Sequence, residues 1–114
     1  MADRARVVEE VMYRQRIRQQ VLYGQFREYM EAAEVLMARR SALGLAAPKL
    51  WAPVVGPGNE IVWELDYADL ATFERETAAF YGDTEAMKHW RALWQLAVQG
   101  STHDELLQEA PRIA

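Results

Sequence analysis

The sequence contains no cysteine, which excludes disulfide bonds, thiolate metal ligands and cysteine nucleophiles. It has no run of about 20 apolar residues of the kind that spans a membrane. It also has no apolar signal-peptide region near its first residues. These absences suit a reducing compartment, so we expect a cytoplasmic protein with no membrane partner.

Basic residues are fewer than acidic ones, and histidine is scarce. The formal net charge is −4 at pH 7, and the chain has 2 histidines. A chain of that sign is not attracted to nucleic-acid phosphates, so we expect no nucleic-acid partner. The two histidines lack the His-Glu-x-x-His spacing, and neither a phosphate loop nor a Gly-x-Ser-x-Gly elbow occurs. We therefore expect neither a metal nor a cofactor.

What is present is a globular composition, because 51% of the 114 residues are hydrophobic and 26% are charged. This length fits one domain, so residues 1–114 are expected to form a single unit.

The first half of the chain alternates and then becomes helical. Alternation within Val8–Arg18 favours a strand over the competing helix Asp3–Gln20. The apolar period of Gln25–Leu43 predicts a helix, closed by Gly44 in a left-handed cap. Arg40 lies near the apolar arc, and we expect its stem to carry the guanidinium out to solvent.

The middle of the chain predicts a hairpin. Lys49–Val55 is a short apolar run, and Pro53 within it indicates an edge strand or a bulge. Gly56–Asn59 is typical of a hairpin connection. The clearest strand is Glu60–Tyr67, in which large apolar residues alternate with acidic ones.

The last third of the sequence predicts two capped helices, followed by a tail whose structure the pattern leaves undecided. Asp69 can cap one helix, which Gly82 ends. Asp83 can cap a second helical piece, whose apolar stripe extends to Gly100. The tail Ser101–Ala114 fits either a final strand or a helical turn.

The resulting order is β-α-β-β-α-β, which is the ferredoxin-like arrangement of an α+β domain with a four-stranded antiparallel sheet. Helices would cover one face of the sheet. The other, half-apolar face needs cover as well, and a second copy related by two-fold symmetry can supply it. We therefore expect a homodimer.

One stretch resembles a known family. Ile61–Arg75 is similar to the core signature of NIPSNAP-like proteins, in which a strand ends in an aromatic residue and an acidic-leucine step starts a helix. Tyr13–Arg16, followed by Gly24 at the opening of a long helix, is similar to the family's first strand and helix. The resemblance covers about residues 8–100. It implies the dimeric α/β barrel fold, which antibiotic-biosynthesis monooxygenases share. The family has no well-defined catalytic set, so no site is carried over.

Charged side chains supply the first candidate site. If the first and third strands are antiparallel neighbours, Arg14 and Arg16 face the same side as Glu60 and Glu64. They can form a ladder of ion pairs that sets the register. Alternatively, they can line a polar cavity inside the dimer barrel and bind an anionic ligand.

Histidines and aromatic rings supply the remaining candidates. His89, which flanks a helix stripe, is a candidate for catalysis or ligand binding. His103 could act as a base oriented by Asp104, or could simply belong to a loop after a helix. Trp51, Trp63 and Tyr67 could line a pocket for a flat molecule, although such rings more often form a core. We expect Trp51 to be the ring outside the core.

These features favour a NIPSNAP-like homodimer of unassigned activity that binds a small organic ligand or a partner protein. The alternative is a cofactor-independent monooxygenase or isomerase that acts on a hydrophobic aromatic substrate between sheet and helices. A cavity of a few hundred Å³ with one titratable group and two aromatic rings would favour the enzyme. A filled cleft would favour the binding or structural role.

Overall fold

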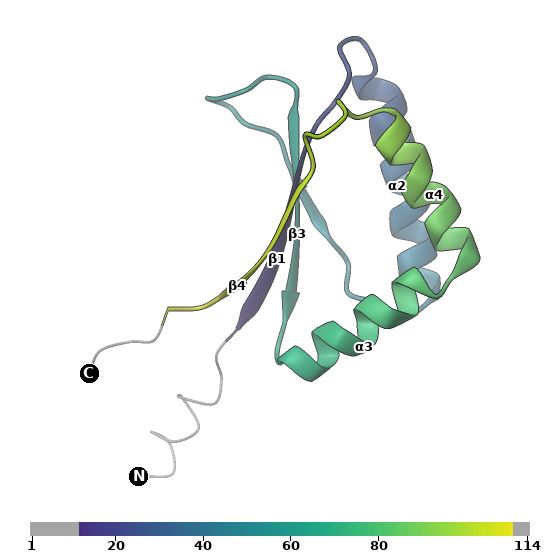
Figure 1. Ribbon diagram of the computed structural model, residues 1–114, viewed down its shortest axis with the longest axis vertical. Coiled ribbons are helices and arrows are strands. Elements are labelled where there is room, and N and C mark those ends of the chain that lie inside the picture. The colour runs from purple at the N-terminus through teal and green to yellow at the C-terminus, as the bar shows by residue number, and fades with distance from the viewer. Residues whose placement is uncertain (1–11, 111–114) are drawn as a thin grey trace.

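The structure is a computed structural model that describes residues 12–110, and over this range helices and strands alternate as a ferredoxin-like fold. The elements are β1 (Tyr13–Gln20), α2 (Phe26–Ala42), β2 (Lys49–Trp51), β3 (Glu60–Tyr67), α3 (Leu70–Tyr81), α4 (Thr84–Gln95) and β4 (His103–Gln108). The strands form one antiparallel sheet in the order β2-β3-β1-β4. All the helices lie on one side of this sheet (Figure 1), so the predicted α+β fold class is confirmed.

The first strand resolves the open choice between strand and helix. β1 begins at Tyr13, and the part of the predicted strand before residue 12 lies outside the described residues. Its side chains alternate, so Ile17 and Gln19 are buried against the helices while the arginines point to the opposite face. Val21, just after the strand, continues the buried set. A helix could not separate these two sets of side chains so completely.

The helix α2 forms as predicted, but Arg40 behaves differently from the prediction. Gly44 follows the helix with φ +72°, the left-handed conformation that favours glycine. Arg40 does not reach solvent, because only 7% of it is exposed. The chain folds back after α2 and places the carbonyl oxygen of Ala46 within reach of the guanidinium, at 3.0 and 3.1 Å.

The hairpin is shorter on one side than predicted. β2 ends at Trp51 rather than at Val55, because Pro53 has no N–H to donate to the sheet. β2 lies at the sheet edge, as expected, and pairs only with β3. β3 has the predicted bounds, Glu60–Tyr67.

Both predicted helix caps are confirmed. A side-chain oxygen of Asp69 accepts the N–H of Thr72 at 2.6 Å, and Asp83 accepts the N–H of Ala86 at 2.8 Å. The helix α4, however, ends at Gln95, before the predicted Gly100. The next residues extend along the end of β1, where the N–H of Val98 donates to the carbonyl of Gln20, and the tail then forms β4.

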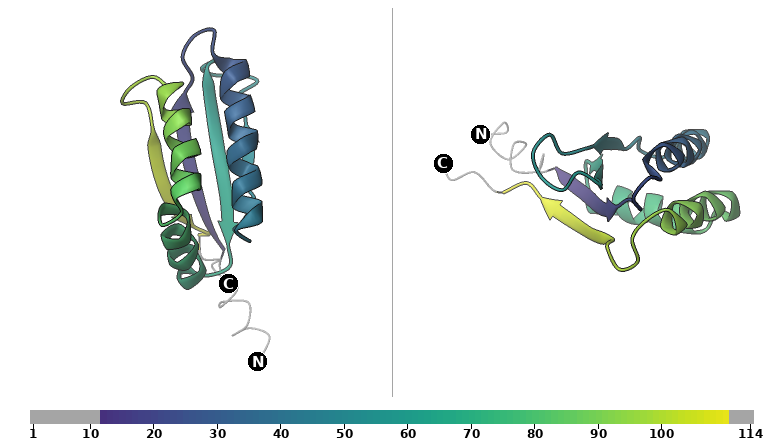
Figure 2. Two further views of the ribbon diagram at one scale, coloured as in Figure 1. Left: turned by 90° about the vertical axis from the view of Figure 1, so that its right-hand side faces the viewer. Right: turned by 90° about the horizontal axis from the view of Figure 1, so that it is seen from above.

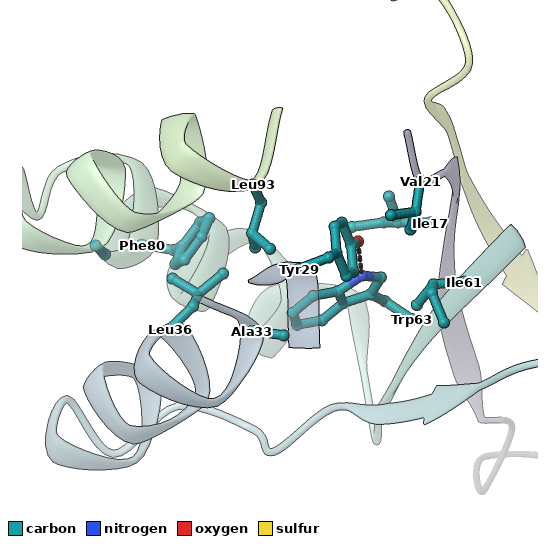
Figure 3. Close-up of a cluster of buried hydrophobic side chains, with 10 residues drawn as sticks. Ile17, Val21, Tyr29, Ala33, Leu36, Ile61, Trp63, Phe80 and Leu93 are labelled. Carbon is teal, nitrogen blue, oxygen red and sulfur yellow. Dashed lines mark hydrogen bonds between the residues drawn. The ribbon is translucent and has the colours of Figure 1, made fainter. Parts of the chain in front are cut away.

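The helices lie against one face of the sheet (Figure 2). The core fills the space between them, where Tyr29, Leu36 and Leu93 are buried completely or almost so. Trp63 lies among them, with 2% of its surface exposed, and its indole N–H donates to the Tyr29 hydroxyl at 2.7 Å (Figure 3). That hydroxyl donates to the side-chain oxygen of Gln19 at 2.5 Å. The core therefore contains a buried polar network in which each member has a partner.

The length and polarity of the helices decide whether any of them could span a membrane. Within residues 12–110, none of the helices combines the length and the apolar character that crossing a bilayer requires.

Candidate functional site

The outer face of the sheet, meaning the face opposite the helices, has a ladder of ion pairs. Arg14 donates to Asp66 at 2.7 and 3.2 Å, and Arg16 donates to Glu64 at 2.8 Å. In each case the two residues are direct partners in the β1–β3 register. The predicted placement of the two arginines on the same face as Glu60 and Glu64 agrees with this register, which also puts Asp66 on that face. The cross-strand pairs stabilise the register.

The outer face is more charged than the predicted half-apolar surface. Over the strands that the structure describes, its apolar members are Trp51, Val62 and Leu107, while arginines of β1 oppose acidic residues of β3. The pairing satisfies these charges within one subunit. The apolar character of this face is therefore a weaker ground for a second copy than the sequence pattern indicated.

A groove on the outer face has a volume of about 340 Å³. It is lined by Met12, Arg14, Arg16, Asp66, Leu107 and Glu109. Both arginines in it already donate to carboxylates of β3. Since acidic residues also line the groove, an anion placed there would compete with existing ion pairs and meet like charge.

A second space, which we call the sheet–helix cavity, lies between the inner sheet face and the helices, with a volume of about 40 Å³. Its walls are Gln15, Ile17, Leu36, Arg40, Pro48, Trp63, Leu65, Tyr67, Glu76, Thr77, Phe80, Tyr81 and Trp90. That volume admits a few water molecules or a group the size of a carboxylate. It does not admit a whole aromatic ring.

Arg40 and Glu76 form the polar end of this cavity. Nε and Nη2 of Arg40 donate to the carbonyl oxygen of Ala46, and the Ala46 N–H donates to Glu76 Oε1 at 2.7 Å. The Cζ atom of Arg40 lies 5.0 Å from the ring centroid of Phe80, within cation–π range. The two charged side chains therefore hold the backbone of Ala46, a residue of the loop between α2 and β2.

Two tyrosines complete the polar lining. Tyr67 is buried and packs edge-to-face on Phe73, with the ring centroids 5.3 Å apart. Burial raises the pKa of the Tyr67 hydroxyl, and Arg40 opposes that rise. Burial also raises the pKa of Tyr81, and the carboxylate of Asp104 adds to the rise. Both hydroxyls are therefore neutral donors at physiological pH.

The two histidines lie away from the cavity. The side chain of His89 is partly buried on α4, with Nε2 3.8 Å from Glu85 Oε1, and it is not among the lining residues. His103 is exposed at the start of β4, on the outer face opposite Arg18. Its neighbour Asp104 points to the other face, where its oxygens accept the side-chain N–H groups of Gln15 at 3.0 and 3.1 Å. Alternation along a strand therefore separates the proposed histidine–aspartate pair.

The sequence-based candidates thus divide between the two faces of the sheet. Trp63 and Tyr67 line the sheet–helix cavity, Arg14 and Arg16 line the outer groove, and Trp51 is 53% exposed on the edge strand, outside the core as predicted. Sequence reasoning missed Arg40 and Glu76 as members of the cavity. The sequence signal that could have identified Arg40 was its position close to the apolar arc of a helix.

Metal-binding side chains do not gather in the part of the chain that the structure describes. Among residues 12–110, no group of three or more histidine, aspartate or glutamate residues is placed to hold a metal ion.

Comparisons with known proteins give a consistent fold. No family model matches the sequence, and no curated protein matches it. Among solved structures, a NIPSNAP family protein from Agrobacterium tumefaciens superposes with a TM-score of 0.69 at 16% identity, over 89% of this chain and 87% of that chain. A NIPSNAP-like domain protein from Burkholderia xenovorans gives a TM-score of 0.67 at 20% identity, over 93% of each chain.

A third solved structure is an enzyme. SnoaB, a cofactor-independent oxygenase from Streptomyces nogalater, gives a TM-score of 0.65 at 18% identity, over 90% of this chain and 95% of that chain. At these identities the likeness concerns the fold alone. At that level the resemblance to NIPSNAP-like proteins is confirmed, and the chain has the fold that those proteins share with SnoaB.

Proposed function

We propose that this protein is a cytoplasmic homodimer in which each subunit binds a small organic ligand in the sheet–helix cavity. The observation that carries the proposal is the cavity itself, which combines walls of Trp63, Phe80 and Trp90 with a polar end formed by the buried Arg40 and the half-buried Glu76. Aromatic walls with a few convergent polar groups are typical of small-molecule sites.

The size of the cavity favours binding over catalysis. At about 40 Å³ it accepts one functional group of a ligand rather than an entire aromatic substrate. Its carboxylate, Glu76, already accepts a backbone N–H, and neither histidine lines the cavity. A ligand group that binds Arg40 would therefore have no free base beside it to accept a proton.

Features of the outer face support the homodimer. Met12 and Trp51 are about half exposed there, the groove of about 340 Å³ opens on that side, and β4 is exposed along its length. A second sheet packed on this face would cover Met12, Trp51, the groove and those side chains of β4 that point to this side.

Native mass spectrometry of the purified protein tests both parts of the proposal at once. We expect a species of twice the 13.1 kDa subunit mass, with additional mass from a co-purified small molecule that is released on denaturation. A dilute sample that remains a lone subunit would refute the homodimer. Dimers that never contain or take up a small molecule would refute the binding role.

The second candidate is a cofactor-independent monooxygenase or isomerase that acts on a hydrophobic aromatic substrate. The fold shared with SnoaB favours it, and Glu76 is the carboxylate that could accept a proton in the cavity. Oxygen consumption with an electron-rich phenol as the probe separates the candidates. Turnover that is lost in Glu76→Gln and retained in Glu74→Gln, a surface control on the same helix, would favour the enzyme.

A further inference from the structure

Arg40 is a buried cation that no carboxylate contacts directly in the described part of the chain, although Glu76 lines the same cavity. Only 7% of the residue is exposed, yet among residues 12–110 no carboxylate oxygen lies within 4.0 Å of its guanidinium nitrogens. The neighbouring Arg39, in contrast, donates to both oxygens of Asp83 at 2.9 and 2.7 Å. Because an arginine is always protonated, burial cannot neutralise Arg40, and a buried charge is normally paired.

The groups that do contact Arg40, among them the Tyr67 hydroxyl, are neutral. The carbonyl of Ala46 takes two of its five N–H groups, from Nε and Nη2, and the ring of Phe80 covers one side. Arg40 also lies in the last turn of α2, where the helix dipole favours a positive charge. These contacts lower the cost of burial, but none supplies a negative charge, and the Nη1 atom is not used by Ala46.

The sheet–helix cavity is where a negative group can reach this guanidinium, since Arg40 is one of its walls. We infer that the ligand of this cavity is a small monocarboxylate with an apolar or aryl body, whose carboxylate pairs with Arg40. The inference rests on the proposed function, because it names the class of ligand for the same site.

The size and charge of the cavity select this class. A cavity of about 40 Å³ accommodates a carboxylate. The apolar or aryl body of the ligand would extend out of the cavity past Tyr81, which is 56% exposed and marks the open side. A planar carboxylate matches the fork of a guanidinium. Glu76 lines the same cavity and repels any anion in it, so a ligand with a single negative charge is favoured over a phosphate, which carries up to two.

Isothermal titration calorimetry with matched probes tests the ligand class on the unaltered protein. Phenylacetate and its neutral isostere 2-phenylacetamide differ in charge and hardly in shape. A charge-assisted pair with Arg40 predicts that phenylacetate binds about tenfold or more tightly than the amide. Inorganic phosphate and benzoate complete the panel, and phosphate is expected to bind more weakly than either carboxylate.

Two substitutions on the same helix assign the preference to Arg40. Arg40→Met should remove the preference for phenylacetate over the amide, whereas Arg39→Met, which alters the neighbouring arginine paired outside the cavity, should retain it. If Arg40→Met does not fold because the loop at Ala46 is released, Arg40→Lys provides a second test with a different expected result. It keeps the charge, so it should keep the preference while it weakens the affinity for phenylacetate.

The outcomes separate the inference from the proposed function. Equal binding of acid and amide, tighter binding of phosphate, or a co-purified ligand without an acidic group would overturn the carboxylate assignment and leave ligand binding intact. If neither carboxylate binds at millimolar concentration, the assignment also falls. If native mass spectrometry in addition finds no ligand, the proposed function falls with it.

Discussion

Removal of one hydroxyl group from Tyr29 should cost this protein a large part of its stability. Tyr29 and Gln19 have no exposed surface, and Trp63 is 2% exposed. The substitution Tyr29→Phe keeps the ring but deletes the oxygen that accepts from the Trp63 indole and donates to Gln19. Two buried polar groups then lose their partners.

The expected magnitude follows from that count. Each buried polar group left without a partner costs about 1–3 kcal/mol, so Tyr29→Phe should lower the free energy of unfolding by about 2–6 kcal/mol. A domain of this kind has a total of about 5–15 kcal/mol. The substitution should therefore shift the urea midpoint strongly, as measured by circular dichroism.

The matched control is Tyr23→Phe, since Tyr23 is fully exposed. It should change the free energy of unfolding by no more than about 0.5 kcal/mol. If Tyr29→Phe behaves like this control, a water molecule replaces the hydroxyl or the network does not form, and the reasoning from buried partners is wrong.

The same network predicts a dependence on alkaline pH. Burial raises the pKa of Tyr29 to about 12 in the folded protein, whereas the pKa of a tyrosine in an unfolded chain is about 10. Between these values the folded state binds more protons, so the stability that Tyr29 contributes is complete below the lower pKa and falls as pH rises through the window. Tyr29→Phe should flatten this alkaline limb in urea titrations.

Three further predictions concern the caps, a turn and the outer ladder. The pKa of Asp83 is lowered to about 2, mainly by the hydrogen bond from Arg39. The stability that Asp83 contributes should therefore be lost as pH falls from about 4 to about 2, and Asp83→Asn should reduce the dependence of the free energy of unfolding on acid pH. Gly44→Ala, at φ +72°, should cost about 1 kcal/mol in urea unfolding, whereas Gly58→Ala, in open space without a positive φ, should cost nearly nothing; equal effects would contradict the cap. Arg16→Met should cost only about 0.2–1 kcal/mol, because the pair of Arg16 with Glu64 is a cross-strand pair whose arginine is 27% exposed. Phenylacetate affinity should not change, and a loss of affinity would move the site to the outer face.

Local patterns were sufficient for most of the fold. The alternation of Glu60–Tyr67 and the aspartate caps at Asp69 and Asp83 depend on residues only a few positions apart, so the sequence predicted them correctly. The opposition of Arg16 and Glu64 followed from a single assumption, that the first and third strands pair antiparallel.

Tertiary structure decided the positions where distant segments compete for one side chain. Helical periodicity placed Arg40 near an apolar arc but could not show that the chain folds back and brings the Ala46 carbonyl to it, or that the Phe80 ring from a later helix covers it. The end of α4 was likewise set by pairing between Val98 and Gln20 rather than by Gly100. Sequence determines the period of each segment because that is local geometry. Burial of a charge and the extent of a cavity depend on which remote segments meet, and only the assembled fold specifies that.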